Sequence, residues 1–310
     1  MIYTVTLNPA IDRELLVPEI VQDNVLRASQ WRIDYGGKGF NVARMLKVLG
    51  TSSVALAFAG GNNGRILHKG LQEMGIETDF VWVEEETRTN VSIVGTNDNH
   101  HIKVNEPGPT ISVGHLAEMQ QKIYQLAQPD DWWVLAGSLP PSVPLSIYAG
   151  MIEIIQTAGG HAILDTSDEA LHKGCLAKPF LIKPNAEEAY KLTGRDFDVH
   201  SESFVAAANA IHDMGPAHVV ISMGKTGALL TDGSRTWIAS SPKIIELNPT
   251  GAGDAMVGGL VWGLSQGQDL TEAFTLSVAC GAATAAQRGT SVGSADNITK
   301  LMAQIELTEY

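Results

Sequence analysis

Short apolar segments recur along the chain at a spacing that is typical of a parallel β-sheet. Each is a run of hydrophobic or β-branched residues bounded by polar or glycine-rich sequence, and such runs indicate buried strands. The predicted strands span residues 2–7, 53–59, 132–136, 162–164, 180–182 and 218–222. Segments with helical periodicity lie between them, at residues 39–49, 116–127, 144–158, 187–192 and 204–214.

This alternation of strands and helices predicts an α/β protein with a doubly wound, mainly parallel sheet that has helices on both faces. Connections between parallel strands are right-handed, so the carboxyl ends of the strands meet along one edge of the sheet. Folds of this kind bind their ligands at that edge. We therefore expect the functional residues to follow the predicted strands.

Two regions of the chain interrupt the alternation with strands that no helix covers. The pattern predicts these strands at residues 14–17, 30–35, 89–94 and 101–104, the last two joined by a polar turn at residues 96–99. They form either a small separate sheet that folds over the main one or two surface hairpins. The first interpretation predicts a single domain over residues 1–310, with a lid made of segments of about 12–35 and 88–106.

Composition and charge narrow the functional classes. The chain has 310 residues, of which 44% are hydrophobic and 18% charged, as in an ordinary globular protein. Its net charge of −13 argues against binding to nucleic acid or to an anionic membrane surface. The apolar segments are too short to span a bilayer. Cys175 and Cys280 form no disulfide framework or metal-ligand spacing, and no signal peptide is recognisable, so we expect a cytoplasmic protein.

A glycine-rich corner, NPTGAGDAMVGG, occupies residues 248–259. A strand is predicted before it at residues 243–247 and a helix within it at residues 252–264. Glycines at such a turn let backbone N–H groups point outward at the positive end of the helix dipole, which favours an anion. Asp254, in the first helical turn, is either a helix cap or a base that accepts a hydroxyl proton during phosphoryl transfer.

Other phosphate and catalytic motifs fit the chain poorly. Gly224-Lys225-Thr226 is similar to the end of a Walker A loop, but Val219 stands where its first glycine would be. The first strand leads into residues 8–10 without a G-x-G-x-x-G pattern, so a dinucleotide fold is not supported. The metalloprotease pattern H-E-x-x-H does not occur.

A second glycine-rich turn, DYGGKGFNVA at residues 34–43, combines a flexible backbone with a lysine and an asparagine. With the corner, it resembles the ribokinase-like PfkB carbohydrate kinases, in the branch that holds 1-phosphofructokinase and tagatose-6-phosphate kinase. The resemblance covers nearly the whole chain and implies a three-layer α/β/α fold with a small β-sheet lid. The segments that carry it are TLNPAID (6–12), GGKGFNVA (36–43), TRTNV (87–91), GSLP (137–140), KPNAEE (183–188), SMG (222–224) and GAGD (251–254).

The resemblance implies an ATP- and Mg²⁺-dependent kinase. Asp254 would be the general base, and the backbone amides of Gly251, Ala252 and Gly253 would form the anion hole. Asn185 and Glu188 would hold Mg²⁺ mainly through water, with Asp165 in its outer shell; Asn185 and Glu188 would equally suit a helix capping box. The implied nucleotide-binding residues are Lys183, Asn185, Ser222, Gly224 and Gly227.

On the sugar side, the resemblance implies that Asp12 binds substrate hydroxyls. Three cations, Lys38, Arg88 and Lys103, are expected to converge beside the lid, as a sugar phosphate would require and a free sugar would not. The alternative for each cation is a solvated surface residue. The implied sugar-phosphate site comprises Asp12, Gly37, Lys38, Asn41, Arg88, Lys103, Ser138 and Arg27.

The implied reaction is phosphorylation of fructose 1-phosphate at its C6 hydroxyl. The alternatives are the same chemistry at C1 of tagatose 6-phosphate or fructose 6-phosphate, a free-sugar or nucleoside kinase, and a sensor that binds sugar phosphate without catalysis. Asn248-Pro249 departs from the Asp-Thr or Ser-Thr that usually precedes the glycines of this family, which leaves the sugar phosphate open. Lid sheets of this branch often pair between subunits, so we also expect a homodimer.

Overall fold

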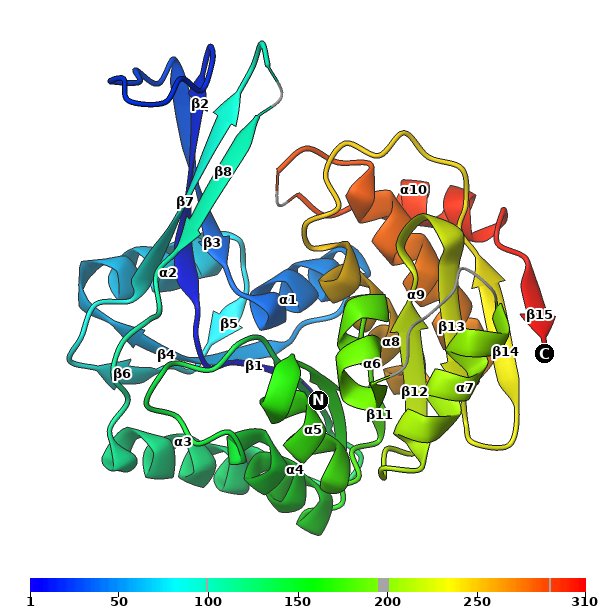
Figure 1. Ribbon diagram of the computed structural model, residues 1–310. Helices are drawn as coiled ribbons and strands as arrows, with labels where there is room; N and C mark the ends of the chain where they lie inside the picture. Colours follow the sequence, from blue (N-terminus) through cyan, green and yellow to red (C-terminus); the bar gives the residue numbers. More distant parts are fainter. Residues whose placement is uncertain (99, 195–200, 290) are drawn as a thin grey trace.

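The core of the protein is a mixed eleven-stranded sheet, described here from a computed structural model that covers residues 1–98, 100–194, 201–289 and 291–310 (Figure 1). The strand order is β15-β14-β13-β12-β11-β10-β9-β1-β4-β5, and β6 also pairs with β4. Strands from β12 to β5 run parallel, whereas β13, β14 and β15 add an antiparallel edge. The strands are β1 (Ile2–Thr6), β4 (Val54–Gly60), β5 (Glu77–Thr78), β6 (Val81–Val83), β9 (Trp132–Ala136), β10 (His161–Asp165), β11 (Leu181–Ile182), β12 (His218–Ser222), β13 (Gly227–Thr231), β14 (Thr236–Ser240) and β15 (Leu307–Glu309).

Helices cover both faces of this sheet, which gives the predicted three-layer α/β/α architecture. One face packs against α1 (Lys38–Val48), α2 (Gly61–Glu73), α8 (Ala252–Ser265) and α9 (Leu270–Ala285), and α10 (Ala295–Met302) packs on α9. The other face packs against α3 (Val113–Leu126), α4 (Ile147–Thr157), α5 (Asp168–Leu176), α6 (Ala186–Thr193) and α7 (Ser201–His212). Because both faces are covered, the central strands are buried on both sides and read as continuous apolar runs. Among the described residues, no helix combines the length and apolar character that crossing a membrane requires.

The six predicted strands and five predicted helices of the alternating pattern are confirmed, with shifts of a few residues at their ends. The strand predicted at residues 243–247 is wrong: this segment is irregular. The position beside β14 is taken by β15, while the backbone N–H groups of Leu247 and Asn248 donate to the carbonyl of Ala285 at the end of α9. Ile245, one of the apolar residues that suggested a strand, is 82% exposed.

The strands that interrupted the alternation pair with one another in a separate four-stranded sheet, called here the small sheet. Its order is β3-β2-β7-β8, with β2 antiparallel to β3 and parallel to β7. The segments therefore belong to one sheet and are not two independent hairpins. Figure 1 shows it standing beside the core. Its strands are β2 (Ala10–Val17), β3 (Gln30–Gly36), β7 (Arg88–Gly95) and β8 (His101–Asn105).

The two faces of the small sheet differ in character because side chains alternate along each strand. Registers pair Asp12 with Asp34 and Asn90, and Glu14 with Arg32, so one face is polar. The opposite face is mostly apolar. Its inner part, with Ile11, Ile33 and Tyr35, packs against α2, and its outer part exposes Trp31, Ile102 and Val104.

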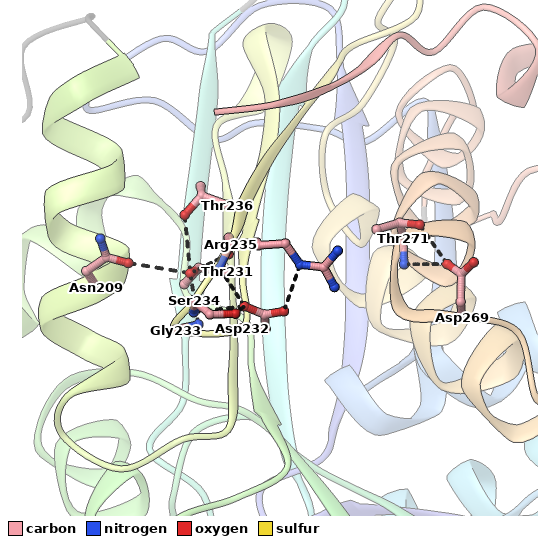
Figure 2. Close-up of polar contacts among 9 residues, drawn as sticks. All are labelled: Asn209, Thr231, Asp232, Gly233, Ser234, Arg235, Thr236, Asp269 and Thr271. Carbon is pink, nitrogen blue, oxygen red and sulfur yellow. Dashed lines mark hydrogen bonds and ion pairs between the residues drawn. The ribbon is translucent and has the colours of Figure 1, made fainter.

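A tight polar turn joins β13 to β14 and explains why this edge of the sheet is antiparallel (Figure 2). The Asp232 carboxylate accepts hydrogen bonds from the backbone N–H groups of Ser234 (2.9 Å) and Arg235 (2.7 Å). The Thr231 hydroxyl accepts one from the Gly233 N–H at 3.1 Å. Since these bonds close the chain within a few residues, the strands become a hairpin without a crossover helix.

Candidate active site

A cleft of about 1080 Å³ lies at the carboxyl ends of the parallel strands, where the sequence placed the functional residues. Its wall includes the glycine-rich corner, the N-terminus of α6 and the loops after β11 and β12. Lys103 brings the polar face of the small sheet to the same space. The predicted site residues that line the cleft are Lys38, Lys103, Lys183, Asn185, Glu188, Ser222, Gly224, Gly227, Gly251, Ala252, Gly253 and Asp254.

The corner begins helix α8 with Gly251 in the left-handed conformation (φ 82°, ψ −6°), which L-residues with side chains rarely adopt. Its amides are not all available to a ligand. The Ala252 N–H donates to the carbonyl of Pro249 at 3.1 Å, and the Thr250 N–H donates to the Asn248 side chain at 3.0 Å. Within the described part of the chain, the amides of Gly251, Gly253 and Asp254 donate no hydrogen bond. These three amides, rather than that of Ala252, are therefore free to hold an anion.

Asp254 stands in the first turn of α8 and is only 7% exposed. The Asn41 side-chain amide donates to its Oδ2 at 2.8 Å. Arg44, one turn further along α1, donates to the Asn41 Oδ1 at 2.8 Å and to the carbonyl of Tyr35. This chain of bonds fixes the Asp254 carboxylate and leaves its Oδ1 directed to the Lys38 side. Asp254 does not act as a helix cap, because α8 has no side-chain cap hydrogen bond.

Lys38, the first residue of α1, lies deeper in the site than the sequence suggested. Its Nζ is 2.9 Å from Asp165 Oδ1 and 4.0 Å from Asp254 Oδ1. Lys183 approaches from the other side, with its Nζ 3.7 Å from Asp165 Oδ1. A Cβ atom at Gly253 would lie 3.2 Å from the Lys183 Nζ, so this lysine borders the corner. Two lysines thus flank the corner.

These contacts set the charge of the site. Burial favours the neutral form of Asp165, but Lys183 and Lys38 outweigh it and hold the pKa of Asp165 below its ordinary value. Burial raises the pKa of Asp254, against an opposing effect of Lys38. Burial would lower the pKa of Lys38, but the attraction of Asp165 and Asp254 raises it overall. The charged groups around Asp254 therefore comprise an ionised Asp165 and two ammonium groups.

The N-terminus of α6 carries the predicted metal element, and it forms a complete capping box. The Asn185 Oδ1 accepts from the Glu188 N–H, and the Glu188 carboxylate accepts from the Asn185 N–H, both at 2.8 Å. Burial raises the pKa of Glu188. No cluster of three or more His, Cys, Asp and Glu side chains suited to a metal occurs among the described residues. This donor set fits an ion held through water better than one bound directly.

On the small sheet, Asp12 accepts a hydrogen bond from the Asn90 side-chain amide at 2.7 Å, and burial raises the pKa of Asp12. Arg88 lies at the base of the same sheet, where its guanidinium donates to the carbonyls of Glu106 (3.0 Å) and Asn8 (2.9 Å). These bonds connect the segment before β2 with the segment after β8, which are two of the segments that run between the core and the small sheet. Arg88 therefore has backbone partners in the segments that connect the small sheet to the core.

Three other residues that were predicted for the site do not line the cleft. Gly37 precedes α1 as its N-cap residue, and Ser138 is exposed directly after β9. Arg27 is exposed in the segment between β2 and β3, and it does not line the cleft. Arg44 and Asn90 contact predicted site residues but were not themselves predicted from the sequence. Spacing could have suggested Arg44, three residues after Asn41 on a helix, and Asn90 belongs to the quoted TRTNV segment.

The corner has free amides suited to an anion, and beside them lie a hydrogen-bonded carboxylate and two lysines, at the carboxyl edge of a doubly wound sheet. This arrangement is characteristic of enzymes that transfer a phosphoryl group to an alcohol. Comparison with known proteins agrees with this class. The model of the pfkB family of carbohydrate kinases matches residues 4–297, and the chain belongs to that family.

Individual relatives are similar over their full length. The chain is 36% identical over 308 residues to a 1-phosphofructokinase of Bacillus subtilis, covering 99% of each chain. It is 35% identical to a D-tagatose-1-phosphate kinase of Bacillus licheniformis, again with 99% of each chain covered. The crystal structure of phosphofructokinase-2 from Escherichia coli in complex with fructose-6-phosphate superposes with a TM-score of 0.90 at 29% identity, covering 97% of this chain and 98% of that one.

Proposed function

We propose that the protein transfers the γ-phosphoryl group of ATP to the C6 hydroxyl of fructose 1-phosphate, yielding fructose 1,6-bisphosphate and ADP. The observation that carries this proposal is the Asp254 carboxylate, which Asn41 fixes beside free amides at the start of α8. Asp254 accepts the hydroxyl proton as the oxygen attacks phosphorus. The amides of Gly251, Gly253 and Asp254 hold the charge on the phosphoryl group during transfer.

In this proposal, some cations of the site bind the phosphoryl group that is transferred, and others bind the phosphate that the sugar already carries. Lys38 and Lys183 would stabilise the phosphoryl group in transfer because both border the corner: the Lys38 Nζ is 4.0 Å from Asp254 Oδ1, and a Cβ atom at Gly253 would lie 3.2 Å from the Lys183 Nζ. Lys103 and Arg88 belong to the small sheet and would bind the phosphate that the sugar already carries, Arg88 in addition to its bonds to the carbonyls of Glu106 and Asn8. This assignment moves Lys38 from the sugar's phosphate, where the sequence suggested it, to the phosphate being transferred.

The nucleotide would lie along the loops after β11 and β12, where Asn185, Ser222, Gly224 and Gly227 line the cleft. Mg²⁺, which kinases of this kind use, neutralises phosphate charge when bound. Glu188 and Asn185 are suited to hold it through water at the cleft edge. Asp165 fits this role less well, because Lys38 and Lys183 already neutralise its carboxylate.

Turnover on four substrates tests the sugar specificity. We expect the highest kcat/KM on fructose 1-phosphate in an assay of ADP release, with tagatose 1-phosphate, tagatose 6-phosphate and fructose 6-phosphate as competitors. The second candidate, D-tagatose 1-phosphate, is favoured by the Bacillus licheniformis relative. A higher kcat/KM on any competitor would refute fructose 1-phosphate as the preferred substrate. Binding without turnover on all four would favour the non-catalytic sensor.

Replacement of Lys103 tests the sugar-phosphate side of the cleft. Lys103→Met removes a cation from the polar face of the small sheet, so we expect the KM for fructose 1-phosphate to rise by about 10- to 100-fold, the worth of a charge-assisted hydrogen bond. The value of kcat should change by less than about threefold, because the reacting atoms lie at the corner. Steady-state kinetics give both values.

A matched control for this variant is Lys69→Met on the exposed surface of α2, where Lys69 pairs with Glu73 of the same helix at 3.7 Å. We expect its kinetic constants to equal those of the unaltered protein. An unchanged KM in Lys103→Met would show that Lys103 does not bind the sugar's phosphate.

The small sheet is proposed to act as a lid that excludes water from the reacting groups and so limits ATP hydrolysis. Its outer apolar surface, with Trp31 67% exposed, supports the expected homodimer through this sheet, since an exposed apolar surface and edge favour pairing. We place the enzyme in the cytoplasm, where ATP and sugar phosphates are available.

A further inference from the structure

A contact across the cleft joins the small sheet to the core. Arg32 lies on the polar face of the small sheet, four positions along β3 from Gly36, where that strand ends. Gly289 lies in the turn after α9. A Cβ atom added at Gly289 would collide with the Arg32 guanidinium, so the guanidinium packs directly on the glycine backbone. Figure 1 shows the orange segment after α9 on the side of the core that faces the small sheet.

Two carboxylates of the small sheet pair with the Arg32 side chain that makes this contact. Its Nη2 donates to Glu14 Oε2 at 3.1 Å, and its Nε lies 3.3 Å from Asp34 Oδ2. Two carboxylates of the same sheet face thus pair with the guanidinium that packs on Gly289: Glu14 accepts a hydrogen bond from Nη2, whereas Asp34 lies at ion-pair distance from an Nε that has no hydrogen-bond partner among the described residues. They also neutralise its charge. Arg32 is therefore poorly suited to bind a substrate phosphate and well suited to transmit the position of the small sheet.

Gly289 is in turn connected to the anion-binding corner through Asn248. Gly289 is buried and has a positive φ of 65°. Its carbonyl accepts a hydrogen bond from the Asn248 Nδ2 at 2.8 Å, and the Asn248 Oδ1 accepts from the Thr250 N–H at 3.0 Å. Only a side chain with both a donor and an acceptor can make these two bonds, and an ionised aspartate could not. The departure of Asn248 from the usual family sequence thus has a structural use.

We propose that Arg32, Gly289 and Asn248 couple the binding of sugar phosphate on the small sheet to the binding of nucleotide phosphates at the corner. The inference rests on the proposed function, in which these two ligands occupy those two places. A sugar phosphate that holds the small sheet against the core keeps Arg32 on Gly289. Asn248 then holds Thr250 so that the Gly251 and Gly253 amides face the nucleotide. Arg32 and Asn248 are positioning residues that touch neither substrate.

Binding measurements on the full-length protein test this coupling. Isothermal titration calorimetry gives the Kd of fructose 1-phosphate with and without a non-hydrolysable ATP analogue. In the unaltered protein we expect the analogue to tighten sugar-phosphate binding by about tenfold, within the usual range of coupling between sites. Arg32→Gln should reduce this effect to less than about twofold, and it should change the Kd of the analogue alone by no more than about twofold.

Two further variants test whether a loss of coupling is specific to the Arg32–Gly289–Asn248 contacts or follows from any loss of a charged side chain. Asn248→Ala should abolish the coupling and also weaken the analogue alone, because the corner loses its anchor. Arg65→Gln removes the same charge from the exposed surface of α2, where Arg65 donates to Gly61 and Asn62 of its own helix, and it should keep the full coupling.

The inference is overturned if Arg32→Gln couples the two ligands as strongly as the unaltered protein, or if the unaltered protein shows no coupling. Turnover assays on the same preparations separate it from the proposed function. An Arg32→Gln variant that phosphorylates fructose 1-phosphate without coupling supports both. Unaltered protein that binds both ligands cooperatively but transfers no phosphoryl group contradicts only the proposed function.

Discussion

Asp254→Asn is expected to reduce kcat by a factor on the order of 10³ to 10⁴, near the upper end of what a general base contributes. The substitution is nearly isosteric, and it removes the proposed general base. The Kd of fructose 1-phosphate should change by less than about threefold, because the proposal assigns the binding of that ligand chiefly to the small sheet. Rapid-mixing kinetics and calorimetry measure the two quantities. Normal turnover would show that Asp254 is not the base.

Asp232→Asn provides a control for this loss of charge. Asp232 is a hydrogen-bonded carboxylate in the β13–β14 turn, and it does not line the cleft (Figure 2). We expect its kcat to stay within about twofold of the unaltered protein, while Tm falls as the turn loses part of its hydrogen bonding. A comparable loss of activity in both variants would indicate a general effect of charge removal.

The pH dependence of activity follows from the same carboxylate. A base must be deprotonated to accept a proton, so kcat/KM should fall as the pH decreases through the pKa of Asp254. Burial raises this pKa above the ordinary aspartate value of 3.8, and Lys38 opposes the rise. The acidic limb of the profile should therefore lie above pH 3.8 in the unaltered protein.

Lys38→Met is expected to reduce kcat by about 10²- to 10³-fold, the usual cost of removing one group that stabilises charge in the transition state. The KM for fructose 1-phosphate should change by less than about threefold. Loss of the ammonium 4.0 Å from Asp254 Oδ1 should also raise the pKa of Asp254 further, which moves the acidic limb of the pH profile to higher pH. Steady-state kinetics across a pH series measure all three quantities.

Lys38→Arg keeps the charge and should retain more activity than Lys38→Met, which separates electrostatics from damage to the fold. Because Lys38 neutralises the buried Asp165, the thermal stability of each variant must also be compared. A large rise in KM with an unchanged kcat would instead return Lys38 to the sugar's own phosphate. The kinetic constants of Lys103→Met provide the comparison, because a raised KM with little change in kcat is expected for that variant.

Much of the fold followed from local patterns. Apolar runs separated by helical segments predicted the parallel strands, and their carboxyl ends identified the edge where Lys183, Asn185 and Ser222 line the cleft. The glycines of the corner predicted where α8 begins. These predictions succeed because burial and helix termini impose their requirements on consecutive residues.

Other features depended on contacts between distant segments. Residues 243–247 have the composition of a strand, but β15 occupies the position beside β14. Lys38 pairs with Asp165, which is 127 residues away in sequence, and no local pattern predicts this contact. The packing of Arg32 on Gly289 joins segments that no sequence pattern relates.

The sequence by itself thus determined the class of fold, the ligand edge and the corner residues, because each is encoded by the chemistry of neighbouring positions. The tertiary structure alone decided which amides of the corner are free, which carboxylates the lysines neutralise and how the small sheet touches the core. The physical reason is that charge pairing and burial depend on distances in space, and these are fixed only when the strands and helices have packed.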